Sequence, residues 1–181
     1  MRKFDDSGPR ADGPPVVWTG PEVGPALVVI DPSGAARHAE LPPTWRQLTQ
    51  DHQVAWCRVP ASRRSVEDIE DVLESLAERQ APSVTMVAAG EACSTAIEVA
   101  RQFESLVTQI LLVDPTDDTP ESARVTVVAR SAGEGTSGRG DKEVDPEVDR
   151  VPAPLPLGHP DVVAGVVAAL SESDRRAGNI R

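Results

Sequence analysis

The sequence predicts an α/β fold in which a doubly wound, mostly parallel sheet lies between two layers of helices. Short apolar runs with the length of buried strands alternate with longer segments whose apolar residues recur at helical spacing. One unit, residues 84–107, contains a strand, a tight turn at Gly90 and a helix in direct succession. This alternation is typical of parallel sheets covered by helices on both faces. No Gly-x-Gly-x-x-Gly follows a strand, so a dinucleotide site is not indicated.

The individual elements follow from local composition and periodicity. Runs rich in Val, Ile and Leu predict strands over 16–18, 26–30, 53–59, 84–89, 108–113 and 124–129, and a weak, proline-broken strand over 150–156. Helical spacing predicts helices over 45–52, 65–79, 96–107 and the residues after Asp161. The strand at 16–18 is expected at an edge of the sheet.

These elements form one expected domain, residues 16–172. Residues 1–15 are polar and rich in Gly and Pro, which predicts a flexible N-terminal arm. Residues 131–149 are rich in Gly and charge, which predicts a mobile loop. Residues 173–181 are expected to be a polar tail.

Composition limits the classes of partner. The chain has 181 residues with 39% hydrophobic and 3% aromatic residues, so its core must be aliphatic. A net charge of −11 and a pI near 4.7 argue against a nucleic-acid partner, because phosphate binding needs clustered Lys and Arg. No apolar run is long enough for membrane insertion, and the N-terminus lacks the apolar run of a signal peptide. A cytoplasmic protein is the expectation.

Cys57 and Cys93 are the two cysteines, and their spacing fits neither a zinc site nor a disulfide framework. We therefore expect no metal and no cofactor. Partners of another kind, a small molecule or a protein, stay open, and so does the oligomeric state.

The most informative stretch is Val84-Thr-Met-Val-Ala-Ala-Gly-Glu-Ala-Cys-Ser-Thr95. Strand, tight turn and helix in this order are the context of a nucleophile elbow, Gly-x-Ser-x-Gly. On these residues the chain resembles the α/β-hydrolase family. In that alignment Gly90 takes the first glycine position, Ala92 the nucleophile position and Ser94 the second glycine position. An alanine methyl group cannot attack a carbonyl, so the resemblance implies the scaffold without its usual chemistry.

The resemblance covers about residues 24–172. Asp31-Pro32 stands where the family has His-Gly, a strand ends in Asp114-Pro115 as it often does in the family, and Gly158-His159 precedes the final helix, where the family places its catalytic histidine. Many members insert a helical lid after the Asp-Pro strand. Here the chain passes almost directly from Pro120 into the strand 124–129, so no lid domain and only a shallow pocket are expected.

Acyl transfer in this family needs a nucleophile, a base and an acid that orients the base. Cys93 is the nearest replacement nucleophile, since a helix N-terminus lowers a thiol pKa, although it can equally be a small buried cysteine. His159 is the candidate base, or else a helix-capping residue. Chain order allows the acid to be Glu134, Asp117 or Asp141, which can equally be solvated loop carboxylates.

The sequence thus predicts an α/β-hydrolase-like domain that is catalytically inactive and acts as a binding or interaction module. Such a module would use the shallow cleft near Ala92 and His159, or its acidic surface. The alternative is an atypical esterase or thioesterase with Cys93 as nucleophile and His159 as base. A third interpretation is a stabilising subunit of a larger complex.

Overall fold

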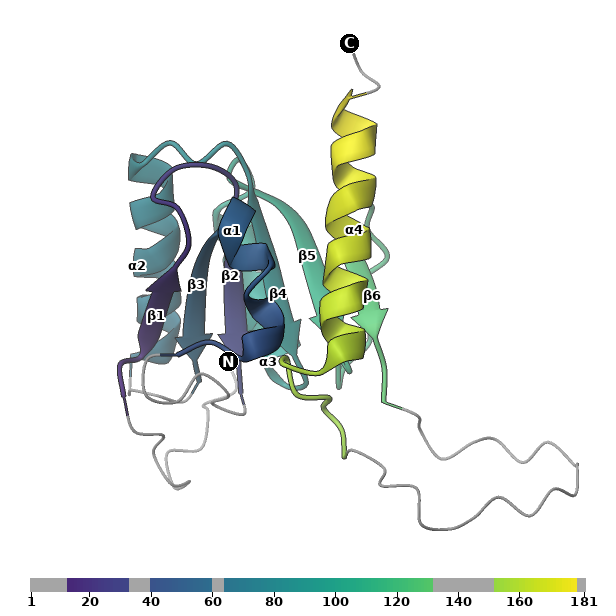
Figure 1. Ribbon diagram of the computed structural model, residues 1–181. Helices are drawn as coiled ribbons and strands as arrows, with labels where there is room; N and C mark the ends of the chain where they lie inside the picture. Colours follow the sequence, from purple (N-terminus) through teal and green to yellow (C-terminus); the bar gives the residue numbers. More distant parts are fainter. Residues whose placement is uncertain (1–12, 33–39, 60–63, 132–151, 179–181) are drawn as a thin grey trace, which may run out of the picture.

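The structure is a computed structural model that describes residues 13–32, 40–59, 64–131 and 152–178. Its centre is a six-stranded sheet with the order β1-β3-β2-β4-β5-β6 (Figure 1). The strands are β1 (Val16–Thr19), β2 (Ala26–Asp31), β3 (Gln53–Arg58), β4 (Val84–Ala89), β5 (Val107–Val113) and β6 (Val125–Ala129). Edge strand β1 runs antiparallel to β3, and all the other pairs are parallel. The expected mostly parallel sheet and its edge strand near Val16 are confirmed.

Helices cover both faces of the sheet. They are the 3₁₀ helix η2 (Pro43–Trp45), α1 (Leu48–Asp51), α2 (Ser65–Glu78), α3 (Ala92–Gln102) and α4 (Pro160–Gly178). Helices α2 and α3 pack on one face, while η2, α1 and α4 pack on the other (Figure 1). The structure therefore has the three layers of the predicted doubly wound fold. In the described residues no helix is both long and apolar enough to cross a membrane.

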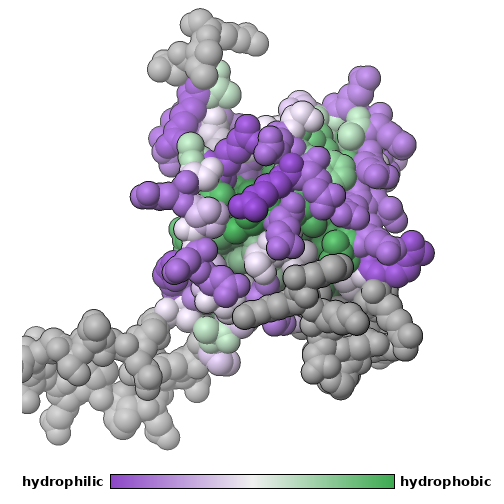
Figure 2. All heavy atoms as spheres, turned by 180° about the vertical axis from the view of Figure 1, so that it is seen from behind, coloured by the Kyte–Doolittle hydropathy of each residue, from purple (hydrophilic) through white to green (hydrophobic). Residues whose placement is uncertain are grey.

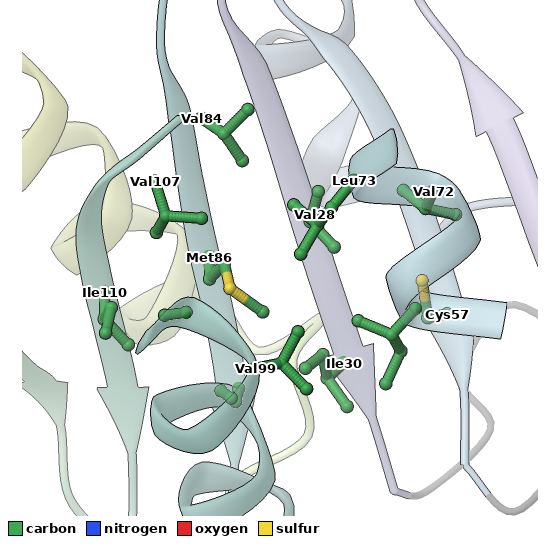
Figure 3. Close-up of a cluster of buried hydrophobic side chains, with 14 of the residues drawn as sticks. Val28, Ile30, Cys57, Val72, Leu73, Val84, Met86, Val99, Val107 and Ile110 are labelled. Carbon is green, nitrogen blue, oxygen red and sulfur yellow. The ribbon is translucent and has the colours of Figure 1, made fainter. Parts of the chain in front are cut away.

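An aliphatic core fills the layer between the sheet and helices α2 and α3. Figure 3 shows strand side chains such as Val28, Met86 and Ile110 meeting Leu73 of α2 and Val99 of α3. Strands β2, β3 and β4 are buried along their whole length, as expected for parallel strands covered on both faces. The opposite layer contains the two large aromatic side chains of the core, which are Trp45 and Trp56.

Three expected boundaries differ from the observed ones. Helix α3 ends at Gln102, and Val107 begins β5 instead of continuing the helix, because the backbone leaves helical geometry at Phe103. The strand expected over 150–156 does not form in its described part, residues 152–156, where alternate prolines have no N–H to donate to a sheet. Helix α4 continues to Gly178 through residues expected to be a tail. Most of the expected arm and loop, 1–12 and 132–149, lie outside the described residues.

Helix α4 approaches β6 closely at Gly165. A Cβ atom added there would lie 2.5 Å from the backbone carbonyl oxygen of Val128 and 3.0 Å from its Cβ. Real Cβ atoms do not approach a backbone oxygen this closely, so only glycine permits the observed packing of the helix on the strand. Gly178, at the other end of the same helix, has nothing within 4 Å of its corresponding position.

We predict that Gly165→Ala lowers the free energy of unfolding by about 1–3 kcal/mol, because the helix must move away from β6. Gly178→Ala is the matched control, and we expect its effect to stay within about 0.5 kcal/mol. Urea unfolding of both variants and the parent measures the difference. Equal stability of the Gly165→Ala variant and the parent would show that α4 does not pack this closely.

Candidate functional site

The topology identifies where a site would form. After β2 the chain moves outward to β3 and then crosses back to β4 on the other side of β2. Ligand sites of open α/β sheets lie at such a switch point, beyond the carboxyl ends of the strands. In this protein Asp31 ends β2 and Gly90 follows β4 at that point.

The turn between β4 and α3 is made by Gly90. Its φ of +54° lies in the left-handed region, and its N–H donates a hydrogen bond to the carbonyl of Val113. Ala92, which the sequence alignment puts at the nucleophile position, is instead the first residue of α3, and its side chain is fully buried in the core. The strained turn of the elbow is thus two residues earlier than expected, at a residue without a side chain.

A segment that precedes α4 covers this turn. We call residues 152–158 the cover segment. A Cβ atom added to Gly90 would lie 2.9 Å from Cγ and 3.3 Å from Cβ of Pro154. The space in which a nucleophilic side chain would stand is therefore filled by the Pro154 ring.

The carboxylate of Asp114 holds the cover segment in place. Asp114 follows β5 with a φ of +45°, and its Oδ2 accepts a hydrogen bond from the N–H of Leu155 at 2.8 Å. Its Oδ1 accepts from the N–H of Ser131 at 2.6 Å and from the Ser131 hydroxyl at 3.0 Å. One side chain thus joins the end of β5, the residues after β6 and the cover segment.

The far end of the cover segment is held from the opposite side. The indole N–H of Trp45 donates to the carbonyl of Leu157 at 2.7 Å, and the hydroxyl of Thr44 donates to the carbonyl of Gly158 at 2.8 Å. Together with Asp114, these contacts hold the backbone of the segment at Leu155, Leu157 and Gly158.

Asp31 belongs to the same network. It is fully buried, and its Oδ2 accepts from the indole N–H of Trp56 at 3.0 Å. The Trp56 ring meets the Trp45 ring edge-on, with centroids 4.9 Å apart. The residue that stands in place of the family's His-Gly therefore supports the tryptophan pair, and through Trp45 the cover segment.

Cys93 lies in an environment that suppresses thiolate formation. Its side chain is buried, and its Sγ lies 3.4 Å from the carbonyl oxygen of Ala88 and 3.8 Å from that of Val113. Burial raises the pKa of the Cys93 thiol to about 12, which outweighs the opposing effect of the Val113 hydrogen bond, and Asp114 and Asp117 raise it by smaller amounts. The expected depression of the pKa by the helix N-terminus is overcome by desolvation.

His159 contacts the helix that it precedes. Its Nδ1 accepts a hydrogen bond from the N–H of Asp161 at 3.2 Å, and its carbonyl accepts from Val162 and Val163. These are contacts that cap the start of a helix. In the described chain no hydrogen bond joins His159 to Cys93.

Of the three candidate acids, one lies in the described residues. Asp117 is exposed in the connection after β5, and Glu134 and Asp141 lie outside the described residues. Asp114 accepts three hydrogen bonds at this edge of the sheet, whereas the sequence singles it out only as part of a strand-ending Asp-Pro. Among the described residues no group of His, Cys, Asp and Glu could hold a metal ion.

Comparisons with solved structures give partial overlaps. No protein-family profile and no curated protein matches the chain. A solved structure described under the metagenome-derived lipolytic enzymes LipS and LipT is 18% identical, with a TM-score of 0.42 over 59% of this chain and 48% of the other. An α/β-hydrolase-fold protein from Burkholderia ambifaria is 15% identical, with a TM-score of 0.40 over 59% of this chain and 42% of the other.

The chain thus spans less than half the length of either protein. Such partial overlaps give no information about the activity of this chain. The six-stranded, mostly parallel sheet with helices on both faces is itself α/β-hydrolase-like, as the sequence predicted.

We predict that both cysteines make the fold sensitive to alkali. Burial raises the pKa of Cys57 as well as Cys93 from 9.0 to about 12, so between these values the folded protein keeps protons that the unfolded chain releases. Stability must therefore fall as pH rises from 9 to 12. The chain has no tyrosine, and its lysines are Lys3 and Lys142, so few other groups titrate in this range.

Urea unfolding between pH 8 and pH 11 measures this loss, and a Cys57→Ala/Cys93→Ala variant should show a smaller one. Iodoacetamide should label native Cys93 very slowly at pH 8, where about one thiol in ten thousand is ionised. Fast labelling of Cys93 near neutral pH, or an equal loss of stability in the double variant, would contradict this assignment.

Proposed function

We propose that this chain is an α/β-hydrolase-like domain without hydrolytic activity, and that it serves as a binding or interaction module. The observation that supports this most is the turn at Gly90, which has no side chain and is covered by Pro154. Nucleophilic catalysis requires a reactive side chain on this turn and room for a substrate carbonyl beside it. Neither requirement is met.

The alternative hydrolase with Cys93 as nucleophile is disfavoured by the surroundings of the thiol. A thiol with a pKa of about 12 is almost entirely protonated at physiological pH, and it is the thiolate that attacks. His159, the base in that alternative, accepts the amide proton of Asp161 with Nδ1 and forms no hydrogen bond with Cys93 in the described chain.

Filling of the elbow also changes where an interaction would occur. The Pro154 ring of the cover segment lies against Gly90, so we favour outer surfaces over the cleft expected near Ala92 and His159 as the place for a partner. One such surface is the solvent-exposed side of α2, which carries the acidic residues Glu67, Asp71, Glu74 and Glu78. We therefore place a protein interaction on exposed surfaces rather than in the elbow.

Hydrolysis of activated esters and thioesters tests the proposal. We expect the purified protein to show no turnover above buffer with a panel of p-nitrophenyl esters and acyl thioesters, and Cys93→Ala and His159→Ala to be indistinguishable from it. A lipase assayed in parallel provides the positive control. Turnover that disappears in Cys93→Ala would contradict the proposal and establish the cysteine hydrolase instead.

Restoring a hydroxyl at the turn extends the same test. We expect Gly90→Ser to gain no activity and to lose stability, because its Cβ would lie 2.9 Å from the Pro154 ring in a left-handed conformation. Ala92→Ser should also gain none, since position 92 lies inside the core. Esterase activity in Ala92→Ser but not in Gly90→Ser would return the nucleophile position to residue 92.

A further inference from the structure

The connection from β5 to β6 leaves part of the sheet without a helical cover. Parallel strands are joined by a crossover of roughly a dozen residues or more, usually with a helix that packs on the sheet. The connection 114–124 is shorter than this and contains no helix. The face of β5 and β6 beside α3 is therefore covered by α3 on one side and by an irregular connection on the other.

A hollow of about 320 Å³ lies in this gap. Its floor is apolar and comes from the sheet, with Val107 and Ile110 of β5 and Val125 of β6. Ile97 and Ala100 of α3 extend the apolar surface along one wall. Figure 2, seen from the side of α2 and α3, shows apolar residues at the surface between hydrophilic ones. Figure 3 shows the side chains of Val107 and Ile110 on β5, at one side of the hydrophobic cluster.

Two arginines also line the hollow. Arg101 lies in the last turn of α3, and Arg124 immediately precedes β6. Arg124 donates to the backbone carbonyl of Glu104 at 3.3 Å, which holds its guanidinium toward α3. Within the described chain neither guanidinium forms an ion pair with a carboxylate, although Glu104 also lines the hollow. Two arginines at one hollow contrast with the net charge of −11 of the whole chain.

We propose that this hollow binds an apolar molecule that carries one carboxylate. The apolar body would lie on Val107, Ile110 and Val125, and the carboxylate would be held by Arg101 and Arg124. Guanidinium groups match carboxylates with paired hydrogen bonds, and the apolar floor beside them provides a surface for the rest of the molecule. The volume is at the lower end of the range for small-molecule sites.

The lining favours a small molecule that is both apolar and anionic, because it combines an apolar floor with two arginines. An inorganic anion would leave the apolar floor exposed to water. The hollow is at the amino ends of β5 and β6, the opposite edge of the sheet from Gly90, so its assignment does not depend on whether the elbow is active.

Sodium decanoate is a suitable probe, with decanol and decyltrimethylammonium as uncharged and cationic counterparts. Titration followed by two-dimensional amide NMR should give saturable shifts confined to residues 97–104, 107–110 and 120–125. Decanoate should bind at least tenfold more tightly than decanol, which corresponds to about 1.4 kcal/mol.

Paired arginine variants locate the carboxylate. Arg101→Gln/Arg124→Gln should weaken decanoate binding at least tenfold and leave decanol binding nearly unchanged. Arg46→Gln/Arg130→Gln removes the same charge from exposed positions outside the hollow and should bind decanoate like the parent. Thermal unfolding of both variants checks that each remains folded.

Four results would overturn the proposal. The first is the absence of saturable decanoate binding to the parent protein. The second is equal binding by the two arginine variants, which would mean that the carboxylate is not held there. The third is decanoate-induced shifts outside the hollow. Binding of an acidic amphipathic peptide in place of decanoate would assign the hollow to a protein partner and likewise exclude a small carboxylate. Ester hydrolysis is measured separately, so that a failure of decanoate binding to the hollow is not confused with a result on the activity of the elbow.

Discussion

The carboxylate of Asp114 is the interaction on which the arrangement of the candidate site depends. It accepts hydrogen bonds from Ser131 and Leu155, which belong to segments on either side of residues 132–151. Hydrogen bonds from neutral donors to a carboxylate are stronger than neutral pairs, and breaking one side of such a set leaves donors without a partner. Because Leu155 is next to Pro154, the same contacts place the proline ring on Gly90. A side chain at the end of a strand thereby closes the place where a nucleophile would act.

Closure of the elbow and exposure of the hollow have a common origin in the connections of the sheet. The path from β5 to β6 is too short for a helix, so one layer of the sandwich is incomplete beside α3. On the other face, the residues before α4 cross the carboxyl ends of the strands and fill the switch point. The central strands remain buried on both faces, as a stable aliphatic core requires. The two faces differ in that a hollow is left beside α3 on one of them.

Most of the sheet could be predicted from the sequence because its strands are short, continuous and apolar, and each is bounded by turn residues. The residue that occupies the sharp turn of the elbow could not be predicted. The motif counts Gly90 as the first glycine, whereas the backbone puts Gly90 itself on the left-handed turn, a property of dihedral angles that one glycine in a sequence does not show. The sequence predicts too long a helix α3, because Leu106 and Val107 continue its apolar spacing. The backbone has already left the helix at Phe103. The role of Asp114 depends on contacts with two other segments of the chain, so no local sequence pattern predicts it.

The account depends most directly on the cover segment being closed, and amide hydrogen exchange of Leu155 and Ser131 tests this. We expect both amides in the parent to be protected to the level of the β4 amides, and Asp114→Asn to release them, since an amide side chain presents a donor to one of the N–H groups. Asp117→Asn, in the same connection and exposed, should change neither. Rapid exchange of Leu155 and Ser131 in the parent would show that the segment does not cover Gly90, and the case for a closed elbow would fail.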